Sequence, residues 1–254
     1  MKIARFSTDG DPRFGILDED EAELIVLTGD PMFSGYDTTG ERVPLANAKL
    51  LAPVIPRSKV IGMGGNYRPE DGSGSQVSEP QMFLKPNTSV IGPGDAVRLP
   101  KGVGRVVYEG ELAIVIGSLA RQVSAERAMD VVFGYTIGND VTAADRMSDT
   151  PWTTAKLYDS FSPLGPIMET ELDPSELSID VSVDGEHRGG ASTASMIRSI
   201  PEIIELASSV FTLLPGDVIL TGAGAGVVGD LVDGATVDIT IDGIGTLSNP
   251  AITR

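Results

Sequence analysis

Short apolar segments separated by polar turns run through the first part of the chain. Three of them, residues 3–6, 14–17 and 24–27, have the length and the polar boundaries of β-strands. Prolines then recur at positions 44, 53 and 56, which restricts the backbone and indicates a connector. We therefore predict a small β-rich N-terminal domain of residues 1–56, followed by a main domain of residues 57–254.

The main domain continues the pattern of short strands. Strands are predicted at residues 59–63, 109–116, 131–138, 179–183, 217–221 and 236–241. Asp184-Gly185 and Asp242-Gly243 fit tight hairpin turns, where glycine accepts a positive φ angle. Two segments are typical of helices, one capped by Ser124 and one over residues 201–211 with a single apolar stripe. This balance predicts a β-dominated α+β fold.

Composition narrows the possible partners. With 36 acidic and 19 basic residues the formal net charge is −17, which argues against nucleic acid or an anionic membrane as a partner. The chain has no cysteine, so disulfides and thiolate chemistry are excluded. No signal peptide or membrane-spanning apolar stretch is evident, and we predict a cytoplasmic location. An acidic protein that binds an acidic substrate needs local positive charge, for example a metal ion or a few lysines.

A pair of glutamates in the strand at residues 109–116 is the most informative local feature. Side chains of a strand alternate between its faces, so Glu109 and Glu111 share one face, which Ala113 continues as apolar surface. Two carboxylates that enter an interior repel each other and lose hydration, a cost that a cation can offset. This strand therefore predicts a cation site.

Asp140 follows the next apolar strand and can add a third carboxylate. In a chain without cysteine and with one histidine, an all-oxygen site favours Mg²⁺, Mn²⁺ or Ca²⁺. The alternative is that the glutamates lie on a solvated strand end and Asp140 caps a turn, since Glu-x-Glu is a common accident. Spacing alone leaves both interpretations open.

Several segments, taken in order, resemble the fumarylacetoacetate hydrolase family from about residue 59 to residue 250. They are Asn66-Tyr67, Phe83-Leu84-Lys85-Pro86, Tyr108-Glu109-Gly110-Glu111, Asn139-Asp140-Val141-Thr142, Ala155-Lys156, Leu214-Pro215-Gly216-Asp217, Thr221-Gly222 and Gly243-Ile244-Gly245-Thr246. Each motif is weak, but their order and spacing are specific.

This resemblance implies a mixed β-sandwich roll, usually a homodimer, that acts on a small 2-oxo acid. Mg²⁺ or Mn²⁺ is implied at Glu109, Glu111 and Asp140, and Lys156 matches the family's active-site lysine. Substrate contacts are expected from matching positions, namely Asn66, Tyr67, Lys85 and Thr221. Metal binding to a 2-oxo acid draws electron density from the ketone and stabilises an enolate.

The chain departs from the family pattern at the base and at two substrate positions. Family hydrolases carry Asp-His where this chain has Pro69-Glu70, so Glu70 is the candidate replacement base, with Asp71 and Glu79 as alternatives. Ala144 stands where the family usually has Arg, and Ala223-Gly224 where it usually has Thr-Pro. Loss of the Asp-His pair favours decarboxylation or keto–enol isomerisation over hydrolysis.

One other function class stays open, and a third is set aside. A noncatalytic relative that binds a metal and a metabolite fits the same substitutions. A nucleotide-binding oxidoreductase is suggested by the glycine pattern at residues 224–229, which formally matches Gly-x-Gly-x-x-Gly. A dinucleotide site requires a helix that begins at those glycines, whereas residues 230–234 are typical of a turn before a strand. His187, the one histidine, is expected to be an exposed hairpin residue.

Overall fold

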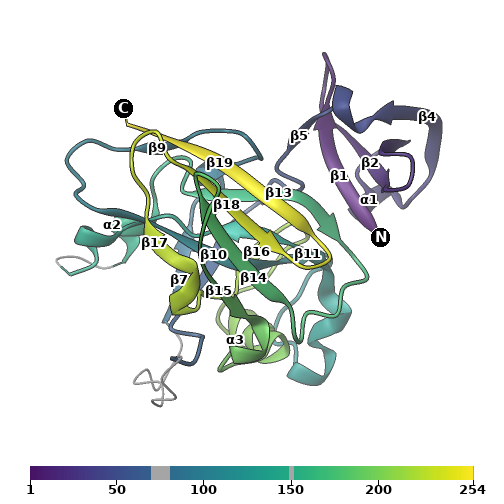
Figure 1. The fold of residues 1–254 in the computed structure, drawn as a ribbon. Helices are drawn as coiled ribbons and strands as arrows, with labels where there is room; N and C mark the ends of the chain where they lie inside the picture. Colours follow the sequence, from purple (N-terminus) through teal and green to yellow (C-terminus); the bar gives the residue numbers. More distant parts are fainter. Residues whose placement is uncertain (70–80, 149–151, 254) are drawn as a thin grey trace.

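The structure is a computed structural model and describes residues 1–69, 81–148 and 152–253. Its described residues form a sheet of fourteen strands and a second sheet of five (Figure 1). The main path of the larger sheet has the order β4-β3-β2-β1-β13-β11-β10-β16-β6-β7, and the smaller sheet has the order β15-β14-β18-β19-β9. The protein is thus β-dominated, as the strand pattern predicts.

The larger sheet draws strands from both ends of the sequence. Its members are β1 (Lys2–Ser7), β2 (Arg13–Asp18), β3 (Glu23–Leu27), β4 (Thr38–Pro44), β5 (Lys49–Leu51), β6 (Val60–Gly64), β7 (Gln81–Lys85), β8 (Val90–Ile91), β10 (Val106–Ile116), β11 (Val132–Asn139), β12 (Thr142–Ala143), β13 (Ser162–Glu169), β16 (Val218–Leu220) and β17 (Val228–Asp230). The smaller sheet consists of β9 (Val97–Leu99), β14 (Ser178–Val183), β15 (Glu186–Ser192), β18 (Thr236–Ile241) and β19 (Gly245–Thr253).

Helices are short in the described part of the chain. The α-helices are α1 (Pro31–Ser34), α2 (Thr153–Lys156) and α3 (Ile200–Val210). The 3₁₀ helices span Leu45–Asn47, Asn87–Ser89, Ala125–Val131, Ala144–Arg146, Thr193–Ser195 and Ala225–Val227. None of these helices is long and apolar enough to cross a membrane.

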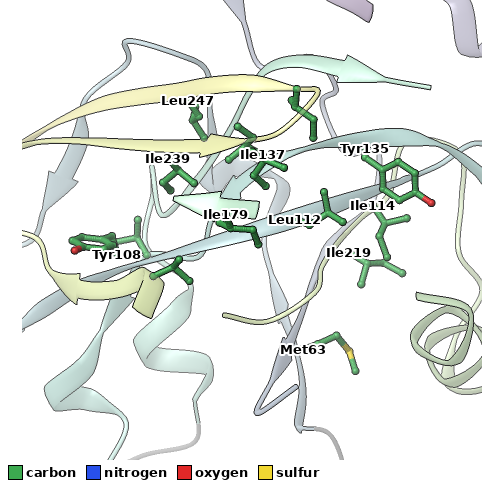
Figure 2. Packing of buried hydrophobic residues seen from close by; sticks show 14 of the residues in the cluster. Met63, Tyr108, Leu112, Ile114, Tyr135, Ile137, Ile179, Ile219, Ile239 and Leu247 are labelled. Atoms are coloured by element: carbon green, nitrogen blue, oxygen red, sulfur yellow. The ribbon is translucent and has the colours of Figure 1, made fainter. Parts of the chain in front are cut away.

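The main core lies between the two sheets. Figure 2 shows Leu112 of β10 and Ile137 of β11 close to Ile179, Ile239 and Leu247, which come from the smaller sheet. All five side chains are at most 1% exposed. A glycine at position 110 allows this close approach, because a Cβ there would lie 3.1 Å from Val181 and 3.2 Å from Ile239. The sandwich that the family resemblance implies is therefore present.

The N-terminal strands β1 to β4 form a meander at one side of the main body (Figure 1). The three strands predicted before residue 30 are confirmed as parts of β1, β2 and β3. β1 also pairs with β13 through Lys2 and Ile3, so backbone hydrogen bonds connect this meander to the larger sheet. The domain boundary near Pro56 stays a prediction.

Both predicted helices exist, with one correction. Helix α3 begins after Ser199, whose backbone N–H and hydroxyl both donate to Glu202 at 2.7 Å, and its buried Ile203, Ile204 and Ala207 face the core. The segment after Ser124 is a 3₁₀ helix, and the Ser124 side chain makes no capping hydrogen bond. Ser124 therefore occupies the predicted N-cap position, but it precedes a 3₁₀ helix and caps it without a side-chain hydrogen bond.

The structure agrees with the rejection of a dinucleotide site at residues 224–229. Ala225–Val227 is a single 3₁₀ turn, and strand β17 follows it directly. A nucleotide site of that class needs an α-helix whose N-terminus faces the phosphates. No such helix begins at these glycines.

Candidate active site

The two faces of strand β10 contact two different buried clusters of side chains. Leu112 and Ile114 belong to the core between the sheets, whereas Ala113 and Val115 belong to a second buried cluster on the opposite face. Glu109 and Glu111 lie on the Ala113 face because strand residues alternate. Glu111 is 2% exposed, and the Glu109 side chain is 20% exposed. The predicted face for the glutamates is therefore buried at Glu111 and partly open at Glu109.

Asp140 meets the glutamates at the end of the neighbouring strand β11. Its backbone N–H donates to the Glu109 carbonyl at 2.9 Å, and its side chain is 1% exposed. One carboxylate oxygen from each of Glu109, Glu111 and Asp140 lies within 4.8 Å of the others. The structure thus brings together the three carboxylates that the sequence singled out, rather than leaving them on a solvated strand end.

Two buried lysines face this carboxylate cluster. Lys156, in α2, donates to Glu109 at 2.9 Å and also pairs with Asp140. Lys85, at the end of β7, pairs with the other oxygen of Asp140 and donates to the Val141 carbonyl at 3.0 Å. Three carboxylates and two ammonium groups leave one formal negative charge when all are ionised, so the cluster still favours a cation.

The charges shift one another's pKa values in opposite directions. Burial raises the pKa of Glu111 well above its ordinary value, and repulsion from Asp140 and Glu109 adds to this effect. Burial acts in the same direction on Asp140, but Lys156 and Lys85 prevail and lower its pKa. Burial lowers the pKa of Lys85. Burial also lowers the pKa of Lys156, but Asp140 and Glu109 raise it by more. Lys156 therefore stays protonated at neutral pH.

The donor set suits a hard divalent cation. Carboxylate oxygens are the preferred protein ligands of Mg²⁺, Mn²⁺ and Ca²⁺, and the three here converge from two adjacent strands. Burial first, and then repulsion from Asp140 and Glu109, raises the pKa of Glu111, so its ionised form is unfavourable without further positive charge beside it. A divalent cation would supply that charge, so the residues present fit the metal that the resemblance implies.

Neighbouring groups orient the glutamates. The backbone N–H of Gly222 donates to Glu111 at 2.7 Å, and the Thr142 hydroxyl donates to Glu109. Gly222 has φ +95°, and a Cβ there would lie 2.7 Å from the Met63 carbonyl oxygen, so only glycine fits without strain. Sequence reasoning missed these roles, although both residues stand inside motifs that carry the family resemblance.

A cavity of about 280 Å³ opens onto the cluster. The Phe83 and Trp152 rings form part of its wall and meet edge to face, with centroids 5.8 Å apart. The Lys156 ammonium lies 4.7 Å from the centroid of Phe83. Glycines at positions 62 and 64 make room for these rings, since a Cβ would come within 2.1 Å of Phe83 and 2.3 Å of Trp152. A small ligand in this cavity would lie between carboxylates, a lysine and aromatic rings.

The four predicted substrate contacts lie behind the cavity wall. They do not line the cavity, and each is at most 7% exposed. Asn66 is fully hydrogen-bonded to backbone, donating to Thr221 at 2.9 Å and accepting from Arg198 at 3.0 Å. The Thr221 hydroxyl donates to the Leu112 carbonyl at 3.0 Å, and the Lys85 ammonium contacts Asp140 and Val141.

Tyr67 differs from these three because its buried hydroxyl has no hydrogen-bond partner among the described residues. Burial raises its pKa, so the phenol stays protonated. The roles of Asn66, Tyr67, Lys85 and Thr221 in substrate binding stay predictions, and the observed contacts of three of them are those of residues that shape the site.

The departures from the family pattern fall at the open side of the cavity. Ala144 and Ala223 both line it, so the two positions at which the family usually has polar side chains face the cavity. Glu70, Asp71 and Glu79, the candidate bases, lie outside the described residues. His187 is exposed in the hairpin of β14 and β15, as expected.

Comparison with known proteins agrees with this geometry. The family model for the fumarylacetoacetate (FAA) hydrolase C-terminal domain matches residues 59–252, and a model for the Rv2993c-like N-terminal domain matches residues 1–53. The oxaloacetate tautomerase YisK of Bacillus subtilis is 42% identical over 221 residues, which cover 81% of this chain and 73% of that protein.

Two solved structures extend the comparison. The structure of 5-carboxymethyl-2-hydroxymuconate delta-isomerase from Mycobacterium smegmatis is 42% identical, covers 100% of both chains and has a TM-score of 0.92. Maleylpyruvate hydrolase from Sphingobium sp. SYK-6, solved with manganese(II) and pyruvate, is 32% identical with a TM-score of 0.81 over 100% of this chain and 99% of that one. The family match, the sandwich fold and the carboxylate cluster lead to one conclusion: this chain is an enzyme of the fumarylacetoacetate hydrolase family.

Proposed function

We propose that the protein is a Mg²⁺- or Mn²⁺-dependent enzyme that isomerises, decarboxylates or cleaves a small 2-oxo acid with a 1,3-dicarbonyl arrangement. Oxaloacetate and acylpyruvates are the substrates of this class that we favour. The observation that carries the proposal is a single small cavity that joins three convergent carboxylates to a protonated lysine. Ca²⁺ is a third cation that such an oxygen site accepts.

The relatives support this substrate class. One is named for oxaloacetate tautomerisation, one for isomerisation of a hydroxymuconate, and one holds manganese(II) together with pyruvate. Pyruvate and oxaloacetate share a 2-oxo carboxylate end. We infer that this cavity receives the same end of its substrate.

Glu109, Glu111 and Asp140 would hold the cation. When bound there, the cation would act as a Lewis acid toward the 2-oxo group. Gly222 and Thr142 keep two of the three carboxylates in place, which favours a pre-organised site. The Phe83 and Trp152 rings form an apolar wall of the cavity, and displacement of water by a bound substrate would strengthen electrostatic interactions there.

Lys156 stabilises negative charge in this proposal. Asp140 and Glu109 raise its pKa, which favours the ammonium form and suits a hydrogen-bond donor better than the free amine of a Schiff-base mechanism. During enolisation a base removes a proton from the carbon beside the ketone, and the electron pair moves to the ketone oxygen. Decarboxylation moves the pair of the breaking C–C bond to the same oxygen. Lys156 can donate a hydrogen bond to that oxygen in both reactions.

Hydrolysis is the second candidate reaction and needs a base that activates water. No histidine lines the cavity in the described part of the chain, and Glu70 is the carboxylate that we propose in place of the Asp-His pair. Isomerisation consumes no water and decarboxylation depends on an electron sink. For this reason we favour these two reactions over cleavage of an acylpyruvate.

A direct assay tests the proposal. The purified protein would be stripped of metal with a chelator, reloaded with Mg²⁺ or Mn²⁺, and supplied with oxaloacetate and acetylpyruvate. Enol-to-keto conversion, CO₂ release and acetate release would be followed separately. We expect metal-dependent turnover of oxaloacetate. Metal-bound protein that is inactive on every 2-oxo acid would support the noncatalytic alternative instead.

A homodimer and a cytoplasmic location complete the proposal. Leu84, Leu157 and Val210 are exposed apolar side chains around a hollow of about 780 Å³, next to Phe83 and Trp152. A second copy of the chain is the partner we propose for this apolar surface. Light scattering during size-exclusion chromatography measures the mass, and Leu84→Asp combined with Val210→Asp should convert the dimer to a monomer.

A further inference from the structure

The cavity has a basic side chain at its mouth that the family motifs do not include. Arg105 lines the cavity together with Ala144, the position that usually carries arginine in the family. The two residues are adjacent, since the Ala144 backbone N–H donates to the Arg105 carbonyl at 2.8 Å. An arginine thus reaches the same place from the loop before β10 rather than from the segment after β12.

Two aspartates hold Arg105 in position. Its Nε donates to Asp230 at 2.5 Å, and its backbone N–H donates to Asp145 at 3.0 Å. The side chain is 56% exposed, so its tip remains accessible to a ligand. A guanidinium has five N–H donors in a planar fork, and the bond to Asp230 uses one of them.

The rest of the cavity has few other groups that could bind a second carboxylate of a substrate. Among the described residues that line it, Arg105 and Lys156 are the basic side chains, and Lys156 lies at the carboxylate cluster, where it pairs with Glu109 and Asp140. Val107, Met147 and Val228 form apolar surface near the mouth. A ligand whose 2-oxo end lies at the carboxylate cluster would therefore meet positive charge again at Arg105.

We propose that Arg105 replaces the missing arginine at position 144 and binds the second carboxylate of a 2-oxo dicarboxylic acid. This inference rests on the proposed function and narrows its substrate class. Arginine binds a carboxylate through two parallel N–H donors, and such charge-assisted bonds are among the stronger polar contacts. The enzyme selects oxaloacetate-like dicarboxylates over 2-oxo acids whose far end is uncharged.

Substitution of Arg105 tests this selectivity. Arg105→Met should raise KM for oxaloacetate roughly 10- to 100-fold, because one charge-assisted pair is lost, with kcat changed less than about 3-fold. KM for acetylpyruvate, which has an uncharged methyl ketone at that end, should stay within about 2-fold. Binding of oxalate to the metal-loaded protein, measured by calorimetry, should also be unchanged. Arg121→Met, at an exposed arginine outside the cavity, is the matched control with the same loss of charge.

A relocated arginine gives a second test. Arg105→Ala combined with Ala144→Arg should recover at least about a third of the lost oxaloacetate selectivity, since it restores a guanidinium at the mouth. Equal loss on oxaloacetate and acetylpyruvate, or no loss on either, would overturn the role of Arg105 while leaving the proposed function intact. Absence of turnover and of oxalate binding in the metal-loaded wild type would overturn both.

Discussion

The deep end of the cavity and its mouth are built differently. At the deep end Glu111, Asp140 and Lys156 are at most 2% exposed, and each is held by at least one hydrogen bond or ion pair. At the mouth Ala144 and Ala223 have no polar side chain, and Arg105 is half exposed. Buried charges must be fully paired to be tolerated, so the deep end resists change more than the mouth.

This difference separates two properties of the enzyme. The deep end determines which cation and which reactive group are bound, and these are common to the proposed reactions. The mouth determines which groups at the far end of the substrate are accepted, and at the mouth the residues of this chain differ from the family pattern. Substitutions at the deep end should therefore affect stability, metal binding and every reaction, whereas those at the mouth should affect particular substrates.

Removal of Asp140 should have the largest effect. Asp140→Ala leaves the ammonium groups of Lys85 and Lys156 without their shared partner, so we expect a loss of about 3–5 kcal/mol in unfolding free energy. Metal-dependent turnover should fall below detection. Urea denaturation and a metal-dependent assay measure the two effects, with Asp9→Ala, at an exposed aspartate far from the cavity, as control. Unchanged stability would contradict the buried charge network.

Substitution of Glu70 should separate the two reaction classes. If Glu70 is the base of hydrolysis, Glu70→Gln should slow acylpyruvate cleavage by roughly 10²- to 10⁴-fold. Decarboxylation or tautomerisation that depends on the metal and Lys156 should hardly change. Rates on acetylpyruvate and oxaloacetate measure the difference. Efficient cleavage in a variant that lacks Glu70, Asp71 and Glu79 together would remove this loop from the mechanism.

A methyl group at position 222 should have a smaller effect on the fold and a specific effect on metal binding. Gly222→Ala forces a Cβ toward the Met63 carbonyl and strains a positive-φ backbone, which costs about 1–3 kcal/mol. The shifted N–H no longer holds Glu111, so affinity for Mn²⁺ should also fall. Gly185→Ala, in an open hairpin turn at φ +79°, has comparable backbone strain and should leave Mn²⁺ affinity unchanged. Equal affinity in both variants would contradict a positioning role for Gly222.

Neutralising Glu111 should raise or lower the melting temperature, depending on the pH and on whether metal is bound. The pKa of Glu111 is higher in the folded protein than its ordinary value near 4.5. As the pH rises from the ordinary pKa toward the folded-state pKa, ionisation of Glu111 therefore lowers the stability of the metal-free protein. Metal-free Glu111→Gln should therefore melt higher than wild type at neutral pH, and the difference should disappear in acid. With saturating Mg²⁺ the order should reverse, since only wild type binds the ion well. Thermal melts at several pH values measure this, and the same order in both states would contradict it.

The sequence predicts the deep end better than the mouth, for a physical reason. Strand alternation puts Glu109 and Glu111 on one face, and the resemblance adds Asp140 and Lys156. The contacts of Lys85 with Asp140 and of Gly222 with Glu111 join residues 55 and 111 positions apart, and no local pattern reports such pairs. Arg105 was missed because it lies in no family motif, and only the folded chain brings it beside Ala144.

Local sequence patterns also predict only part of the fold. Alternation identifies β10 and β11, which lie at the centre of the larger sheet. β13 was missed because Pro163, Gly165 and Pro166 are typical of turns, although this strand pairs with both β1 and β11. Long-range pairing overrides the local preference of these residues.

Stoichiometric binding of Mn²⁺ is the sharpest test of a metal site at the carboxylate cluster, because it requires no assumption about the substrate. Metal-free protein would be titrated with Mn²⁺ by calorimetry, for the wild type and for Glu111→Ala, with Asp9→Ala as control. We expect one Mn²⁺ per chain in the wild type and the control, and none in Glu111→Ala. A wild type that binds no Mn²⁺, or a Glu111→Ala variant that binds it with unchanged affinity, would contradict the carboxylate cluster as the metal site.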